Sequence, residues 1–267
     1  MFKNDLNWLN GFATAWKDRE DHARIPHAVL LSGPVGVGKR AAARWIAARQ
    51  LEADTASALP AYPVEPLEHA DLHWVAPLED KQAISIDQIR QLVHEFALTS
   101  YGGVGKVAVI EPANAMTHNA ANSLLKTLEE PPGNALLILI ADRAGRLPAT
   151  IFSRCQRIDI ALPAEQASLA WLDRVQPGTD WAEALHLAGN APLAAIEALE
   201  QLLGELAQWD NYRRFHREIG QLLRDQRKLA EQSTELGRRT LTRELRDIEP
   251  QDRADLRILA GRQLDLA

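Results

Sequence analysis

The chain has 267 residues, of which 46% are hydrophobic and 25% are charged, a balance typical of a globular protein of roughly two or three domains. Its formal net charge of -6 excludes a cationic field over the whole molecule, so any contact with nucleic acid must be local or made by partners. A single cysteine, Cys155, excludes an intrachain disulfide and a cysteine-rich zinc site.

The chain also lacks signals for export or membrane insertion. The first residues, MFKNDLNWLNGF, have no apolar core of the kind found in a signal peptide. Strongly apolar runs such as residues 135–141 are far shorter than the roughly 20 residues that cross a bilayer. Together with the lone cysteine, these features predict a cytoplasmic protein with no membrane contact.

The first 162 residues alternate short apolar runs with amphipathic segments, which predicts a parallel sheet with helices on both faces. The predicted strands are 28–32, 72–75, 106–110, 135–140 and 156–160, and the predicted helices are 41–51, 85–99, 117–130 and 148–154. Ser85 is expected to cap its helix, and Pro131 to end the next one. The proline-rich segment 53–70 is predicted to be a loop.

Beyond Pro163 the pattern is helical throughout, with no convincing strand. The predicted helices are 164–174, 180–188, 191–207, 209–230, 234–247 and 250–264. We predict an α/β base domain over 1–162, a small helical lid over 163–205 and a further helical domain over 206–267.

The stretch GPVGVGKR, residues 33–40, lies between a predicted strand and a predicted helix, which is the context of a phosphate-binding loop. In such a loop backbone N–H groups and a lysine bind the phosphates, and a Ser or Thr hydroxyl coordinates Mg²⁺. The candidate residues for binding ATP or ADP are therefore Gly33, Gly36, Gly38 and Lys39.

Arg40 stands where the metal-binding hydroxyl should be. A guanidinium has only donors and a permanent positive charge, so it cannot coordinate a cation, and no metal site is predicted. Two interpretations stay open: the loop binds nucleotide through its backbone and lysine alone, or it is empty and structural.

Three segments together resemble the clamp-loader branch of the AAA+ proteins: NSLLKTLEEPP at 122–132, the strand after it, and Ser153-Arg154-Cys155. The resemblance covers residues 20–162, and beyond 205 only helicity supports it. It implies a RecA-like α/β P-loop domain, an all-α lid and an all-α collar through which subunits assemble. The family's zinc module has four cysteines, but residues 52–70 have none, so no zinc is expected.

The same resemblance implies that the chain's own catalytic site is degenerate. Active relatives carry Asp-Glu after the third strand, whereas this chain has Glu111-Pro112, and proline has no side-chain base. Glu111 either reaches a metal through water or simply ends its strand. Asp142 follows the fourth strand at the polar sensor position, where we expect it to face solvent or cap a turn. Pro192 replaces the lid arginine, so no hydrolysis is expected from the isolated chain.

Arg154 keeps the family's pattern, and the resemblance assigns it as an arginine finger that enters the nucleotide site of a neighbouring subunit. A guanidinium placed there stabilises the charge that develops on the γ-phosphoryl oxygens. The alternative is an ordinary surface ion pair, worth about 0–1 kcal/mol. Cys155 is expected to pack inside and to be a poor nucleophile.

The resemblance therefore implies a non-hydrolysing, stator-like subunit of the bacterial replicative clamp loader, a component of the DNA polymerase holoenzyme. Its partners are gamma/tau-type motor subunits and a delta-type subunit in a pentamer, and, through that complex, the sliding clamp and primed DNA. The alternatives are an active clamp-loader ATPase and a phosphate-loop phosphotransferase, which the helical C-terminal third argues against. Arginines such as Arg213 and Arg217 form either a DNA-facing patch or the solvated face of collar helices.

Overall fold

The computed structural model describes residues 4–52, 58–142, 145, 147–240 and 250–265, and all structural statements below concern these residues. The chain divides into two compact units, Met1–Leu199 and Glu200–Ala267, which are described separately. The predicted domain boundaries at 162 and 205 stay predictions.

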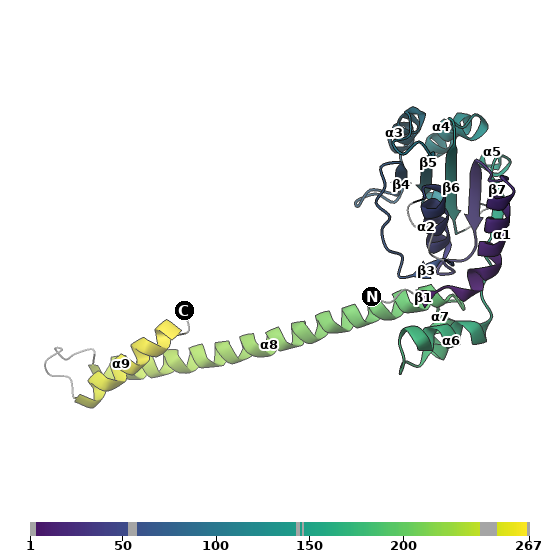
Figure 1. Ribbon diagram of the computed structural model, residues 1–267. Helices are drawn as coiled ribbons and strands as arrows, with labels where there is room; N and C mark the ends of the chain where they lie inside the picture. Colours follow the sequence, from purple (N-terminus) through teal and green to yellow (C-terminus); the bar gives the residue numbers. More distant parts are fainter. Residues whose placement is uncertain (1–3, 53–57, 143–144, 146, 241–249, 266–267) are drawn as a thin grey trace. The chain divides into compact units, whose positions relative to one another are not determined.

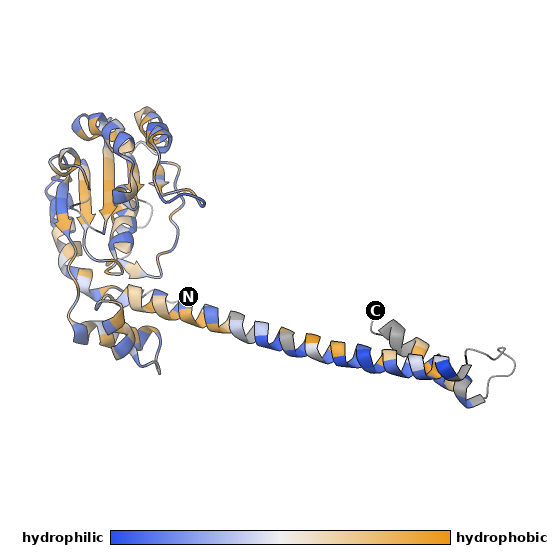
Figure 2. Cartoon of the chain, turned by 180° about the vertical axis from the view of Figure 1, so that it is seen from behind, coloured by the Kyte–Doolittle hydropathy of each residue, from blue (hydrophilic) through white to orange (hydrophobic). Residues whose placement is uncertain are grey.

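A five-stranded sheet forms the centre of the first unit, with strand order β4-β5-β6-β2-β7 and every neighbouring pair parallel (Figure 1). The strands are β2 (Ala28–Ser32), β4 (Leu72–Val75), β5 (Lys106–Ile110), β6 (Ala135–Ala141) and β7 (Gln156–Asp159). The three central strands are buried along their whole length, which explains why they are apolar except for Lys106 at the start of β5 and Ser32 at the end of β2. Their apolar character is visible in Figure 2.

Each face of the sheet is covered by its own helices. Successive side chains of a strand point to opposite faces. Accordingly Leu136 and Ile138 belong to the apolar cluster that includes α2 (Lys39–Gln50), whereas Leu137 and Leu139 belong to the cluster that includes α3 and α4. Helices α3 (Ile86–Ala97), α4 (His118–Glu129) and α5 (Ala149–Phe152) follow β4, β5 and β6 in the chain. The predicted α/β architecture is confirmed.

Side-chain caps fix the starts of α3 and α4. The Ser85 hydroxyl accepts a hydrogen bond from the Gln88 backbone N–H at 3.3 Å, and the Gln88 side chain accepts one from the Ser85 N–H at 3.0 Å. This reciprocal pair is a capping box, which confirms the predicted cap. Thr117 caps α4 through the Ala120 N–H, and α4 ends just before the two prolines.

The N-terminal elements were not predicted. They are β1 (Asn4–Asp5), the 3-10 turn η1 (Asn7–Leu9) and α1 (Asn10–Asp21), and a second 3-10 turn, η2 (Ala113–Ala115), follows β5. β1 pairs antiparallel with β3 (Ala61–Tyr62), so the prediction of a loop over 53–70 is wrong at β3, while 53–57 lie outside the described residues. A two-residue strand has no periodicity to reveal it, and its partner is distant in sequence.

Helices α6 (Glu165–Val175) and α7 (Trp181–Leu187) complete the first unit together with the start of α8 (Pro192–Thr240). The separate helices predicted over 191–207, 209–230 and the described part of 234–247 are wrong, because α8 is continuous. Its interior contains glycine but no proline, and glycine weakens a helix without ending it. In the second unit α9 (Pro250–Asp265) confirms the last predicted helix.

Candidate functional site

The glycine loop joins β2 to α2, and its backbone adopts conformations that residues other than glycine rarely take. The φ angles are +148° at Gly33, +79° at Gly36 and +98° at Gly38, which precedes the first residue of α2, Lys39. The strand, loop and helix thus have the geometry of a phosphate-binding loop.

The same glycines are required by close packing inside the first unit. A Cβ atom on Gly36 would lie 2.4 Å from the backbone nitrogen of Ala194, and one on Gly33 would lie 2.2 Å from the carbonyl oxygen of Ile160. The Leu193 N–H also donates to the Gly36 carbonyl at 3.1 Å. The loop is therefore packed directly against the start of α8, and its glycines have a structural role apart from any ligand.

The Lys39 ammonium, whose side chain is only 5% exposed, is fully engaged by the protein. Its Nζ donates to the carbonyl oxygens of Gly33, at 2.8 Å, and Pro34, and lies 2.9 Å from Oδ1 of Asp142. Asp142 was expected to face solvent or cap a turn; its side chain is 37% exposed, but its carboxylate also points to Lys39, which was not predicted. A buried ammonium needs a counter-charge, and the end of β6 provides it.

Arg40 and Glu111 form a second ion pair at the loop, with Nε 3.4 Å from Oε2. The guanidinium also lies over the ring of Trp74, whose indole N–H donates to Glu111 at 3.1 Å. Burial raises the pKa of Glu111, although the charge of Arg40 and the hydrogen bond from Trp74 oppose the rise. Glu111 thus has two protein partners at the position where active relatives keep a metal ligand.

A cavity of about 420 Å³ opens at the loop. Tyr62, Val64 and Leu193 supply apolar wall. The charged lining consists of Lys39 and Arg40 against Glu111, Asp142 and Glu197, so acidic side chains outnumber basic ones. Within the described part of the chain, no group of three or more His, Cys, Asp or Glu side chains is placed to hold a metal.

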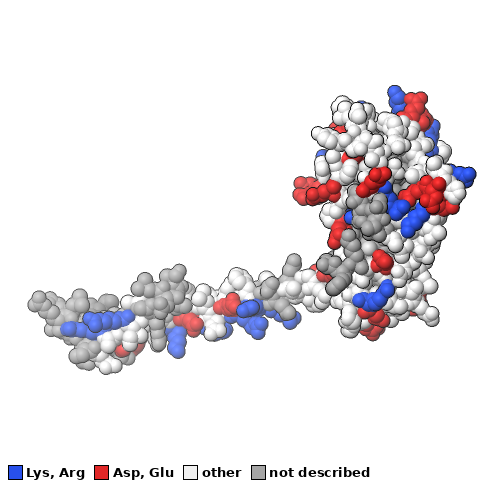
Figure 3. Space-filling view, in the orientation of Figure 1, with Lys and Arg blue, Asp and Glu red and all other residues white. Residues whose placement is uncertain are grey.

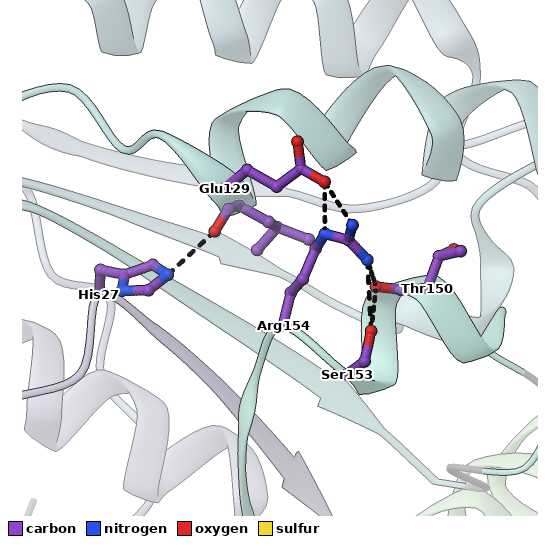
Figure 4. Close-up of polar contacts among 6 residues, drawn as sticks. His27, Glu129, Thr150, Ser153 and Arg154 are labelled. Atoms are coloured by element: carbon purple, nitrogen blue, oxygen red, sulfur yellow. Dashed lines mark hydrogen bonds and ion pairs between the residues drawn. The ribbon is translucent and has the colours of Figure 1, made fainter.

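Arg154 follows α5 and contacts the end of α4 (Figure 4). Its Nε donates to Oε1 of Glu129 at 2.7 Å, and a second guanidinium nitrogen donates to the same oxygen. Nη1 donates to the Thr150 carbonyl at 2.9 Å and to the Ser153 hydroxyl at 3.2 Å. The side chain is 32% exposed. Two of the three segments that carried the family resemblance, 122–132 and 153–155, therefore meet through this pair, and Arg154 does not line the chain's own loop cavity.

Two neighbours complete this region. His27 bonds through Nε2 to the Leu128 carbonyl at 2.9 Å, which ties the end of α4 to the start of β2. Cys155 is buried, and this burial raises the pKa of its thiol to about 11. Such a thiol stays protonated at neutral pH, in agreement with the expectation of a poor nucleophile.

The analysis of the sequence did not find the contribution of the N-terminal segment. The Trp8 indole N–H donates to the Val37 carbonyl in the glycine loop at 2.9 Å, and the Trp171 indole N–H on α6 donates to the Asp5 carbonyl at 3.0 Å. The rings of Trp8 and Trp171 meet edge to face at 5.1 Å. The segment thus links the loop to α6, and its signal in the sequence was Trp8.

Solved structures define the class to which this fold belongs. Two variants of RuvB from Thermotoga maritima align with TM-scores of 0.51 and 0.50, at 16% and 17% identity. They cover 76% and 78% of this chain, and 63% and 65% of their own chains. The fold is that of an AAA+ P-loop protein: a parallel α/β domain followed by helices.

The family model for the DNA polymerase III delta subunit matches residues 10–164. DNA polymerase III subunit delta' of Pseudomonas aeruginosa is 40% identical over 189 residues, which cover 67% of this chain and 58% of the relative. The Escherichia coli delta' subunit is 35% identical over 130 residues, covering 48% and 39% respectively. The chain therefore belongs to the DNA polymerase III delta-subunit family, and both of these relatives are delta' subunits. This agrees with the resemblance to clamp loaders found in the sequence.

Two further findings accompany this assignment. The chain spans between 39% and 61% of the length of the delta' relatives it matches. Among its described helices, none combines the length and the apolar character needed to cross a membrane.

Proposed function

We propose that the chain acts as a non-hydrolysing, stator-like delta' subunit of the bacterial replicative clamp loader and lends Arg154 to the nucleotide site of a neighbouring subunit. The observation that carries this proposal is where the cations lie. Lys39 and Arg40 line the chain's own loop cavity and are paired with carboxylates of that cavity, whereas Arg154 lies outside the cavity, partly exposed and paired with Glu129 at the end of α4.

The chain's own loop lacks the groups that hydrolysis needs. Cleavage of a phosphoanhydride requires a metal to neutralise the phosphates and a residue to position the attacking water. Arg40 replaces the metal-binding hydroxyl, Pro112 replaces the base, and Pro192 is buried at the first turn of α8 where an arginine would be needed. Several independent losses in one site support the absence of turnover.

Arg154 is suited to act on another chain. Its position is held by Glu129 and by the turn at Thr150 and Ser153, so little side-chain freedom is lost when it meets a ligand. The carboxylate of Glu129 is half exposed and can be exchanged for another anion. A γ-phosphoryl group offers the guanidinium the same type of charged acceptor.

The proposed assembly is a pentamer with gamma/tau-type motor subunits and a delta-type subunit. Bacillus subtilis DNA polymerase III subunit tau is 30% identical over 162 residues, covering 57% of this chain and 28% of the relative. The second unit supports assembly through a helical collar, because α8 exposes a series of apolar side chains: Leu202, Leu206, Trp209, Phe215 and Leu222. This part of α8 is shown in Figure 2.

Contact with the sliding clamp and primed DNA is proposed to occur through the complex. On the face of the first unit shown in Figure 3, Lys and Arg side chains alternate with Asp and Glu side chains. Such mixed charge does not provide the basic stripe that binding to phosphate backbones requires. Neither bound nucleotide nor zinc is needed for the proposed role.

The test is the DNA-stimulated ATPase of a clamp loader reconstituted with Arg154→Ala. At the nucleotide site that borders Arg154 we expect the rate to fall by at least about ten-fold, because fingers supply roughly 10³–10⁵-fold in GTPases. Arg90→Ala is the matched control, since Arg90 is a solvent-exposed arginine on α3 with only an i,i+3 partner. Normal ATPase in a fully assembled Arg154→Ala complex refutes the finger, and turnover by the isolated chain refutes the stator role.

A further inference from the structure

The carboxylate of Asp142 lies where a ligand phosphate would meet the loop lysine. β2 and β6 are adjacent and parallel, with Ser32 paired to Ala141, so the end of β6 lies beside the start of the glycine loop. Asp142 is the next residue, and its Oδ1 is 2.9 Å from Lys39 Nζ. Its backbone N–H is oriented by the Asn114 side chain at 3.4 Å.

This contact completes the coordination of the lysine. An ammonium has three N–H donors. Two are directed to the Gly33 and Pro34 carbonyls and the third to Asp142, while the side chain is 5% exposed and has no open side to water. A phosphate oxygen can bind Lys39 only by displacing one of these three acceptors. Whichever acceptor leaves, the carboxylate of Asp142 would then lie beside another anion and repel it.

The remaining charges of the cavity add to this exclusion. Arg40 is the second cation of the lining, and it is paired with Glu111. Glu197 adds a further carboxylate to the wall. The lining of the cavity therefore has three acidic side chains and two basic ones, and each basic side chain is already paired with a carboxylate. A nucleoside phosphate that approaches the loop finds no unpaired cation in this lining.

We infer that Asp142 acts as an internal counter-anion that excludes nucleoside phosphates from an otherwise formed binding loop. The backbone of the loop keeps its positive-φ glycines, and the cavity of about 420 Å³ lies within the roughly 300–1,000 Å³ range of ligand pockets. The site is thus latent: the carboxylates of the lining, above all Asp142 on Lys39, keep it free of nucleoside di- and triphosphates, although the loop is not collapsed. This inference concerns the chain's own loop and stands whether or not Arg154 is a finger.

The test compares binding of ATP, ADP and tripolyphosphate by the purified chain, measured by calorimetry at low salt without Mg²⁺. We expect the wild-type chain to bind none of them measurably at millimolar concentration, and Asp142→Asn to bind ATP at least ten-fold more tightly. Adding Lys39→Ala to that variant should abolish the gain. Asp87→Asn is the matched control, because it makes the same substitution at an 86% exposed position outside the cavity and should give no gain.

Equal and weak binding by wild type and a folded Asp142→Asn chain overturns the inference, as does tight binding of ATP by the wild type. A gain with ATP but not with tripolyphosphate also overturns it, because the excluded group is then not the phosphate. Asp142→Thr is a second neutral variant if the asparagine variant does not fold. If neither folds, the side-chain NMR signal of Lys39 in the wild type decides: no change with millimolar ATP is expected, and a saturable shift contradicts the inference.

Discussion

Replacing Gly36 by alanine tests whether the glycine loop is a structural joint between the sheet and the start of α8. At φ +79° an L-residue is strained by about 1–2 kcal/mol. The added Cβ would also lie 2.4 Å and 2.5 Å from the nitrogen and Cβ of Ala194, and overpacking of this kind typically destabilises by about 1–3 kcal/mol. We therefore expect Gly36→Ala to lower the free energy of unfolding by about 2–5 kcal/mol.

Comparison with Gly103→Ala separates the effect of packing against Ala194 of α8 from the effect of backbone strain. Gly103 has a similar φ of +74°, but a Cβ there meets nothing within 4 Å, so only the backbone strain of about 1–2 kcal/mol is expected. Urea unfolding followed by tryptophan fluorescence is a suitable assay, because six of the seven tryptophans lie in the first unit. Equal destabilisation by the two variants would show that the packing of the loop against α8 contributes nothing to stability.

Three further predictions concern single side chains. Ser85→Ala removes the capping box of α3 and should lower stability by about 1 kcal/mol in urea unfolding; Ser123→Ala, at an interior position of α4, should have less effect. Cys155, with its pKa raised to about 11, should not react with Ellman's reagent at pH 8 until the chain is unfolded, and rapid reaction of the folded chain contradicts its burial. Burial raises the pKa of Asp71, but hydrogen bonds from the backbone N–H groups of Gly102 and Tyr101, together with nearby positive charge, outweigh this rise. The folded pKa of Asp71 therefore lies below the usual value. Its stabilising contribution should therefore be present above about pH 4 and lost as the pH falls through the folded pKa; an unchanged acid unfolding curve in Asp71→Asn contradicts this.

Local signals were sufficient to predict most of the first unit. Buried runs such as Leu136–Ile140 have no solvent-facing side and are apolar at every position, so they predict strands without reference to the rest of the chain. Ser85 and Gln88 stand at the spacing of a capping box, and that spacing alone gives the start of α3.

The features that were missed depend on contacts between distant segments. The pairing of Asp142 with Lys39 exists because β6 lies next to β2 in the sheet. Local periodicity predicts strands but does not predict their order in the sheet. A surface ion pair of Arg154 was one of the two alternatives drawn from the sequence, but its partner Glu129 could not be named, because the contact requires the end of α4 to meet the end of α5. The continuity of α8 was missed for a different reason: helical periodicity does not distinguish one long helix from consecutive shorter ones, and no glycine or proline marked the predicted breaks at 208 and 231–233.

The most direct test of the central claim is a structure of the assembled clamp loader with a non-hydrolysable ATP analogue bound. The account predicts that the γ-phosphate held by the adjacent subunit takes the place of Glu129 on the Arg154 guanidinium and lies within hydrogen-bonding distance of it, while the cavity at Lys39 contains no nucleotide. It is contradicted if Arg154 remains on Glu129 and points away from every neighbouring nucleotide.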